Sequence, residues 1–329
     1  MTCLHFFQYA FLTVASAMAL LSAPVVAQSP AKTKVVLIAG AKSHPSGQHE
    51  FAAGGKILAR ALNEQSGLPI EVVLVTNGWP QDESVFNGAK AVICYADGGG
   101  KHPFVAHLDK VEALTKAGVG IMCMHYGVEV VPAQAGEQFK RWIGGFYEGG
   151  YSVNPHWDAD TQPTKDHPVS RGVQPVKVND EWYFHMRLPE PPTASPLLQA
   201  TPTRALIKRY IHWNASADAE LDKPQTLMWG VQRPDGGRGV GFTGGHWHRN
   251  WAIDDFRKVV LNAIVWTAGL EVPEGGVKSL PVTEAQLNEN LDVKNPMVQV
   301  KAPSPEDFTL PTAAPVGNNY PPAPKPKNP

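Results

Sequence analysis

Uninterrupted hydrophobic runs alternate with amphipathic segments over the first 130 residues. The apolar runs predict buried strands over residues 34–39, 70–76, 89–96 and 120–124. Between them, apolar residues spaced three and four apart predict helices over residues 51–65 and 104–117. Continuous apolar strands separated by helices are typical of a parallel sheet with helices on both faces.

The pattern weakens between residues 130 and 225, where glycine, proline and aromatic residues are frequent. Only isolated strands are predicted there, such as one over residues 182–186. We interpret this region as a loop- and strand-rich insertion that lies over the carboxyl edge of the sheet.

Regular structure returns after this insertion. Residues 225–232 and 238–243, joined by a Pro-Asp-Gly-Gly turn, predict a β-hairpin. A last helix is predicted over residues 254–268, with Asp254 as its N-cap and Gly269 at its end.

The start of the chain has the pattern of a secretory signal. Residues 6–21 are almost wholly apolar. The segment Val25-Val26-Ala27 follows, with small residues at the positions that a signal peptidase recognises. Residues 1–27 are therefore predicted to be a signal peptide, which implies a periplasmic or secreted protein. An uncleaved membrane anchor is the alternative, but the run is short for a span, so no stable membrane span is expected after cleavage.

The remaining boundaries follow from composition. Residues 33–270 are predicted to form one α/β domain. Residues 271–301 form an extended arm, which could wrap the domain or contact a second copy in a homo-oligomer. Residues 302–329 contain nine prolines in 28 positions, which predicts an extended or disordered tail.

Charge and cysteine content narrow the function classes. With 29 Lys and Arg against 30 Asp and Glu, the formal charge is −1, which argues against sequence-independent nucleic-acid binding. Cys94 and Cys123 lie in two strand-like runs, which could bring the thiols close enough to bridge, although buried thiols are the commoner outcome. Neither lies in a CxxC pair, so a zinc ribbon is not indicated.

Histidines follow several predicted strands, at the edge where ligands bind to open parallel sheets. They are His44 and His49, His102, His125, and His246 with His248. Imidazoles that converge in a cleft act either as general acids and bases or as metal ligands, and the sequence leaves both alternatives open.

Spacing gives candidates for a divalent ion such as zinc. In His246-Trp247-His248, two imidazoles lie on one side of an extended chain, and His49 and Glu50 could add nitrogen and oxygen ligands. The candidate ligands are His44, His125, His246 and His248.

Two other motifs bear on the chemistry. The turn after residues 120–124 resembles a nucleophile elbow, but His125 occupies its exposed position, so the usual Ser or Cys nucleophile is missing. The triple glycine at 98–100 lacks the spacing of a nucleotide-binding loop.

Several of the nine tryptophans lie beside polar clusters, a mixture that suits a sugar or polyol.

The chain resembles the ThuA-like (trehalose utilisation) family over about residues 33–270. The resemblance rests on Gly118-Val-Gly-Ile-Met-Cys-Met-His125-Tyr126-Gly127-Val-Glu129, Trp142-Ile-Gly-Gly-Phe146, Asn154-Pro-His156-Trp157, Asp166-His167-Pro168, Asp180-Glu181-Trp-Tyr183, Gly244-Gly-His246 and Val260-Leu-Asn-Ala-Ile-Val-Trp266.

This resemblance implies a flavodoxin-like fold, similar to that of class I glutamine amidotransferases. His125 stands where those enzymes carry their cysteine, which removes glutaminase chemistry. The expected catalytic residues are His125, His246 and Glu181. The expected substrate-binding residues are His44, Asp97, Tyr126, Glu129, His156, Trp157 and Trp247.

The family's association with disaccharide utilisation implies a sugar or 3-keto sugar as substrate. A keto group acidifies the neighbouring C–H, so a positioned base and an oxyanion stabiliser could drive elimination or isomerisation. Two alternatives remain open: a non-catalytic sugar-binding or scaffold protein, and a metal-dependent hydrolase.

Overall fold

The computed structural model describes residues 1–2, 31–190, 192–207 and 215–304. The predicted signal peptide and almost all of the proline-rich tail lie outside the described residues. The described residues from Lys32 onward belong to one compact unit. Within the described part of the chain, no helix has the length and apolar character needed to cross a bilayer.

Nine strands of the described chain form one sheet, in the order β2-β1-β3-β4-β9-β8-β7-β5-β6. The first five are mutually parallel. They are β2 (Ile70–Val75), β1 (Thr33–Ala39), β3 (Ala89–Tyr95), β4 (Gly120–Met124) and β9 (Arg238–Phe242). Four of them match the predicted apolar runs, and the α/β fold class is confirmed.

The other half of the sheet is antiparallel. Its strands are β8 (Gln225–Gln232), β7 (Ser195–Ala200), β5 (His156–Pro163) and β6 (Val176–Glu181). β8 and β9 form the predicted hairpin, and the strands of the insertion continue from β8 to the far edge of the same sheet. The insertion thus extends the sheet as well as covering its edge.

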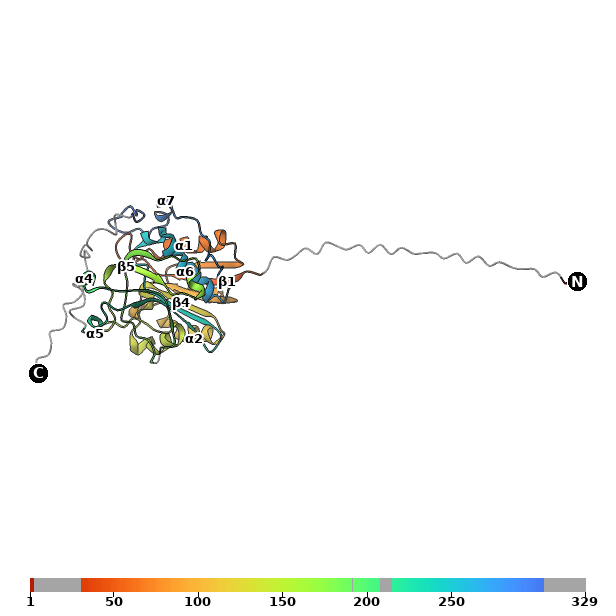
Figure 1. Ribbon diagram of the computed structural model, residues 1–329, viewed down its shortest axis with the longest axis horizontal. Helices are drawn as coiled ribbons and strands as arrows, with labels where there is room; N and C mark the ends of the chain where they lie inside the picture. The colour runs from red at the N-terminus through yellow and green to blue at the C-terminus, as the bar shows by residue number, and fades with distance from the viewer. Residues whose placement is uncertain (3–30, 191, 208–214, 305–329) are drawn as a thin grey trace, which may run out of the picture. The chain divides into compact units, whose positions relative to one another are not determined.

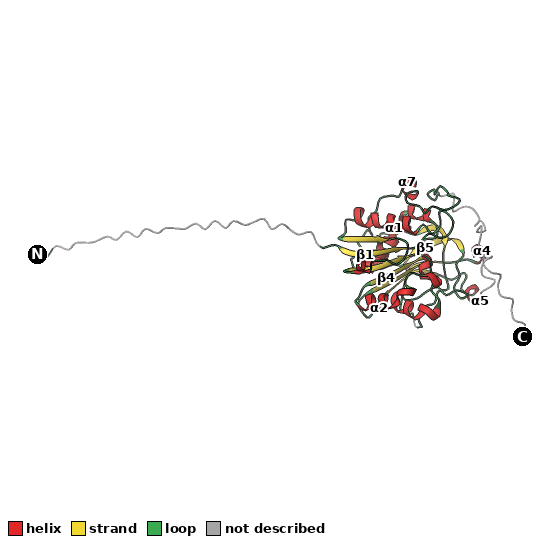
Figure 2. Cartoon of the chain, turned by 180° about the vertical axis from the view of Figure 1, so that it is seen from behind, coloured by secondary structure: helices red, strands yellow, loops and turns green. Residues whose placement is uncertain are grey.

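Helices cover both faces of the sheet (Figure 1; Figure 2). One side carries α1 (Phe51–Arg60), continued by a π-helical turn (Ala61–Gln65), and α6 (Asp254–Thr267). The other side carries α2 (Leu108–Lys116) and α3 (Glu137–Ile143). Three short helices are α4 (Arg204–Ile207), α5 (Ala215–Asp218) and α7 (Glu284–Leu287).

Short helical turns occupy many of the loops. The 3₁₀ turns are Glu83–Phe86, Gly99–Lys101, Val105–His107, His125–Val128, Pro168–Ser170 and His248–Ala252, and Pro132–Gly136 is a π turn.

Alternation along the strands builds two hydrophobic cores. In β1, Val35 and Leu37 join the core beneath α1 and α6, whereas Val36 and Ile38 join the core beneath α2 and α3. Successive strand residues point to opposite faces, so a strand buried on both sides must be apolar throughout. This requirement explains the continuous apolar runs in the sequence.

Some local predictions need correction. The strand predicted over 182–186 lies earlier: β6 ends at Glu181, and after it Phe184 and Arg187 make only isolated bridges, to Val153 and Phe146. Asp254 is the first residue of α6, and Ile253 is its N-cap. Gly269 follows α6 with φ +80°, a left-handed conformation that favours glycine and ends a helix.

The two cysteines lie side by side on β3 and β4. Cys94 pairs in register with Cys123, and both are buried free thiols. Burial raises the pKa of both thiols, so neither forms a thiolate nucleophile readily.

The arm lies along the domain. Leu287 and Val300 are buried in the core beneath α1 and α6. Polar contacts add to this packing: Arg60 of α1 pairs with Glu289, and Lys56 donates to Asn290. Both views place α7 beside α1 (Figure 1; Figure 2).

Candidate functional site

Four side chains from distant parts of the chain meet at one edge of the sheet. His49 lies in the loop after β1, His125 directly follows β4, and His246 follows β9. Glu181 is the last residue of β6. One ligand atom from each of the four lies within 4.8 Å of the others, and all four residues are buried.

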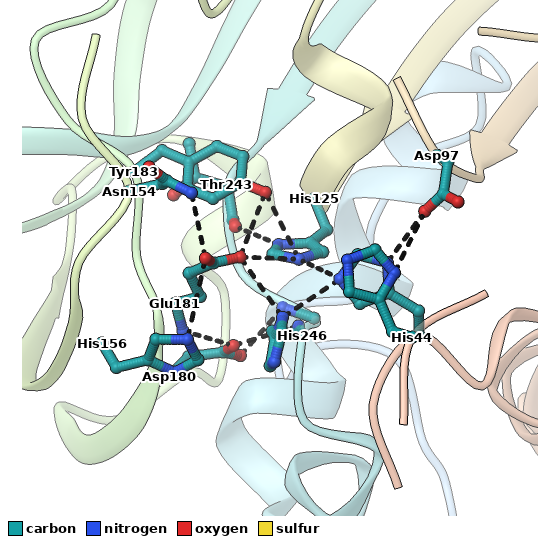
Figure 3. Close-up of polar contacts among 12 residues, drawn as sticks. His44, Asp97, His125, Asn154, His156, Asp180, Glu181, Tyr183, Thr243 and His246 are labelled. Atoms are coloured by element: carbon teal, nitrogen blue, oxygen red, sulfur yellow. Dashed lines mark hydrogen bonds and ion pairs between the residues drawn. The ribbon is translucent and has the colours of Figure 1, made fainter. Parts of the chain in front are cut away.

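The donor atoms face one another closely. His49 Nε2 lies 3.0 Å from His125 Nε2 and 3.0 Å from His246 Nδ1. Glu181 Oε2 lies 3.2 Å from His246 Nδ1 and 3.5 Å from His125 Nε2. Figure 3 shows the Glu181 carboxylate between His125, His156 and His246.

Neighbouring groups determine the tautomers of two of these histidines. His125 Nδ1 lies 2.9 Å from the Thr243 carbonyl oxygen, which can only accept, so Nδ1 carries the proton. His49 Nδ1 lies 2.9 Å from Asp97 Oδ1 and donates to it when that carboxylate is ionised. In the neutral rings, both Nε2 atoms therefore present lone pairs to each other.

Burial keeps these imidazoles neutral. Desolvation lowers the pKa of His125 and of His246 to about 3, and the pKa of His49 lies well below 6.5 for the same reason. Neighbouring imidazoles lower these pKa values further, although the Glu181 charge opposes the shift at His125. Neutral imidazoles at such positions are metal ligands more readily than proton donors near pH 7.

Asp180 organises the antiparallel side of the site. Its buried carboxylate accepts hydrogen bonds from the backbone N–H groups of Glu181, Gly245 and His246, and from Asn250 Nδ2. Burial nevertheless raises the pKa of Asp180 to about 6. One carboxylate thus ties the end of β6 to the loop that carries His246.

Backbone conformation also shapes the site. His125 has φ +52° and His49 has φ +46°, values that residues other than glycine adopt rarely. A sharp turn directly after β4 presents the His125 side chain at the sheet edge, as the comparison with an elbow predicts. Strained positions of this kind cluster at functional sites.

The four residues fit a divalent metal ion. In tetrahedral zinc sites, with Zn–N bonds of 2.0–2.1 Å, neighbouring ligand atoms lie about 3.3 Å apart. Four pairs of donor atoms here lie 3.0 to 3.5 Å apart, and all pairs lie within 4.8 Å. Two facing lone pairs, without a proton between them, repel unless a cation lies between them. Asp97 and Thr243 supply the outer hydrogen bonds that orient metal-binding histidines.

Other predicted site residues surround this four-residue cluster. The His44 ring stacks on His49 at 3.5 Å, and its Nδ1 lies 3.7 Å from Asp97 Oδ1. The His156 Nε2 lies 3.6 Å from Glu181 Oε1, and the Trp247 ring lies 5.5 Å from the His156 ring.

Tyr126 and Glu129 lie on the side that carries His44. The Tyr126 ring is 6.3 Å from the His44 ring. Burial and the Glu181 charge raise the pKa of Glu129 to about 7. The Glu129 carboxyl group can therefore exchange a proton near neutral pH.

The structure does not bring three of the singled-out residues to the cluster. Trp157 is fully buried in the core and donates to the Trp182 carbonyl, because it follows His156 on β5 and points to the opposite face. His248 Nε2 donates to the Leu287 carbonyl of the arm. His102 Nε2 likewise donates to the Gly127 carbonyl.

His49 belongs to the cluster although it is not among the metal ligands predicted from the sequence. Both His44 and His49 lie in the first loop, and nothing in the sequence distinguishes His49 as the inward-facing residue. Asn154 donates to Glu181 Oε1 and Tyr183 lies 3.4 Å from His125 Nε2. Both belong to the motifs that carry the resemblance, which is the signal that could have indicated them.

The ThuA family model, described as trehalose utilisation, matches residues 35–267. The chain belongs to the ThuA family. Among proteins with curated descriptions, none matches this chain.

One solved structure supports the fold of this ThuA-family protein, and two others are similar to a lesser degree. A putative ThuA-like protein from Bacteroides uniformis aligns with TM-score 0.52 at 15% identity, over 73% of this chain and 93% of that one. A putative ThuA-like protein from Parabacteroides merdae gives TM-score 0.48 at 16% identity, over 76% and 98%. A glutamine amidotransferase from Thermotoga maritima gives 0.39 at 10% identity, over 78% and 99%.

Proposed function

We propose that this ThuA-family protein is an enzyme that processes a sugar or 3-keto sugar with the help of a divalent metal ion such as zinc. The residues that would hold the ion are His49, His125, His246 and Glu181. The observation that carries the proposal is the pair of facing Nε2 atoms of His49 and His125, 3.0 Å apart.

The arrangement favours metal-assisted chemistry over a histidine acid–base pair. Because burial lowers the pKa of His125 and His246 to about 3, almost no imidazolium forms at neutral pH to act as an acid. A bound divalent ion polarises a carbonyl oxygen or activates water. Glu129, with a pKa of about 7, is the group suited to accept or return a proton.

The surroundings of the cluster support a carbohydrate substrate. The indole of Trp247 and the phenol ring of Tyr126 offer faces on which the apolar face of a sugar ring can stack. His44, Asp97 and His156 add hydrogen-bonding groups for hydroxyls. The family description, trehalose utilisation, supports the same substrate class.

A proton NMR time course tests this function. The mature protein is incubated with trehalose and with its 3-keto derivative, as isolated, after chelation, and after addition of zinc. His125→Ala is the matched variant. We expect new product signals with the wild type alone, their loss after chelation, and their return with zinc.

Each other outcome selects another function. Line broadening of the sugar without product would favour a non-catalytic sugar-binding protein. Product formation that resists chelation would contradict the role of the metal and return the acid–base alternative. Hydrolysis of an ordinary glycoside in place of the keto sugar would select a metal-dependent hydrolase.

We also propose that residues 1–27 direct export to the periplasm or the medium. The support is the apolar run over residues 6–21 followed by small residues. Expression of the full chain with a C-terminal tag, followed by N-terminal sequencing of the exported form, should give Gln28 as the first residue. Retention of residue 1 in a membrane fraction would indicate an anchor.

A further inference from the structure

The loop that carries His49 has an unusual backbone conformation, with positive φ angles at three positions. Within residues 44–49, His44, Gly47 and His49 all have left-handed φ values of 55°, 82° and 46°. For the two histidines this conformation costs free energy, so contacts from elsewhere must hold the loop.

Glu50 is the centre of those contacts. Its side chain is fully buried, Oε1 accepts from the Gly47 N–H at 2.9 Å, and Oε2 accepts from the Asp292 N–H at 2.8 Å. The loop between β1 and α1 is thereby joined to the arm. A carboxylate buried in this way needs a compensating positive charge.

Lys294 of the arm supplies that charge. Its side chain is 5% exposed, and Nζ lies 3.1 Å from Glu50 Oε1. The same ammonium donates to the carbonyl oxygens of Gln48 at 2.6 Å and Pro45 at 3.4 Å. Lys294 lies 246 positions after Gln48 in the chain. Its side chain nevertheless contacts the residues on both sides of His49, Gln48 and Glu50.

Two further contacts hold the loop in the same place. The arm's Val298 N–H donates to Ser46 Oγ at 3.1 Å. On its other side, His49 N–H donates to the His246 carbonyl and His248 N–H donates to the Gly47 carbonyl. The loop is thus held between the arm and the chain segment that carries His246.

We propose that Lys294 is a positioning residue, which holds the loop of residues 44–50 in the conformation that aims His49 at His125 and His246. The ammonium contacts Glu50 and the Gln48 carbonyl and none of the four cluster residues, although its positive charge also lowers the pKa of His49 and His246. The consequence for metal affinity rests on the proposed function. The arm then positions a residue of the site in addition to packing against the domain.

The test compares two variants that each remove a buried cation joining the arm to the rest of the domain. Lys294→Met removes the contact with the loop. Arg257→Met is the control, because Arg257 is 1% exposed and donates to the Leu280 carbonyl of the arm but makes no contact with residues 44–50. We titrate each metal-free protein with Co²⁺ and follow its visible absorption, and we measure hydrogen exchange of residues 44–50 without metal.

We expect both variants to lower the melting temperature. Only Lys294→Met should weaken Co²⁺ binding, by about 10- to 100-fold, as the loss of an outer-shell partner does, and change the absorption spectrum. It should also speed exchange within residues 44–50. Should Lys294→Met not fold, Lys294→Gln, which keeps a donor without the charge, takes its place with the same expectation.

Two results would overturn the proposal, and they differ from a failure of the proposed function. If Lys294→Met loses stability but keeps the Co²⁺ affinity, the spectrum and the exchange rates of the wild type, Lys294 is only structural. If the two variants change all three readouts equally, the effect is not specific to the loop. If the wild type takes up no Co²⁺, the metal site is refuted, and the exchange rates alone decide whether Lys294 holds the loop.

Discussion

The two halves of the sheet contribute to the site in different ways. Its parallel half, built from β2, β1, β3, β4 and β9, has apolar interiors and delivers histidines from loops at the ends of strands. In the antiparallel half, functional groups lie within the strands themselves: His156 begins β5, and Asp180 and Glu181 end β6. The parallel half therefore serves as a rigid frame, and the antiparallel half brings Glu181, whose carboxylate would balance the charge of a cation at the proposed site.

Acidification should have the largest effect on stability. Burial lowers the pKa of five histidines to about 3 or 4: His102, His125, His156, His246 and His248. The unfolded chain binds protons at these groups below about pH 6.5, whereas the folded chain does not. The contribution of these histidines to the free energy of unfolding should thus be level well above pH 6.5 and fall below it, by up to about 1.4 kcal/mol per pH unit for each histidine.

Denaturant unfolding at pH 7.5, 6.5, 5.5 and 4.5 measures this slope. The raised pKa values of Asp180 and Glu129 act in the opposite direction and offset part of it. Zinc should delay the loss, because the ion competes with protons for His125 and His246 but not for His102. A stability that stays constant down to pH 4.5 would contradict the neutral cluster.

Removal of one ligand from each half tests whether the site spans both. His125→Ala removes a donor of the parallel half, and Glu181→Ala removes the donor that ends β6 in the antiparallel half. Each should weaken zinc binding by more than about 100-fold, beyond the effect of losing an outer-shell partner. Competition with a chromophoric chelator measures the affinities, and a large loss in only one variant would confine the site to one half.

Asp97→Asn should have a smaller effect. The amide can still accept from His49 Nδ1, but it lacks the charge that makes His49 Nε2 a stronger ligand. Zinc affinity should fall by about 10- to 100-fold, with little change in melting temperature. An unchanged affinity would show that the short contact of 2.9 Å with His49 does not tune the ligand.

His44→Ala should have the smallest effect, only a few-fold in zinc affinity. Although His44 stacks on His49, its Nδ1 lies 3.0 Å from Ser43 Oγ and it belongs to the cluster with Asp97 and not to that with Glu181. The affinity should be measured as for the other variants. A loss as large as that of His125→Ala would make His44 a ligand and change the set of donors.

Prediction from the sequence succeeded where local pattern and packing agree. The runs of β1, β3 and β4 must be apolar because both faces of the sheet are covered. Uninterrupted apolar runs of this length therefore predict these strands without the structure. The strand β6 was misplaced because it buries Asp180 and Glu181, whose polarity conceals a buried strand. The motifs point to His125, His246 and Glu181, which the structure brings together in one cluster, whereas the ligand role of His248 finds no support in its contact with Leu287.

By itself, the sequence determined the parallel frame, the hairpin and the set of histidines at the ends of strands, because each depends on residues near one another in the chain. Only the tertiary structure decided which imidazoles meet. His49 rather than His44 turns inward because Glu50, Lys294 and the His246 loop hold its backbone, and Trp157 turns away because the pleat of β5 gives the inward position to His156. The choice of His49 depends on contacts between residues more than 190 positions apart, which local patterns do not encode.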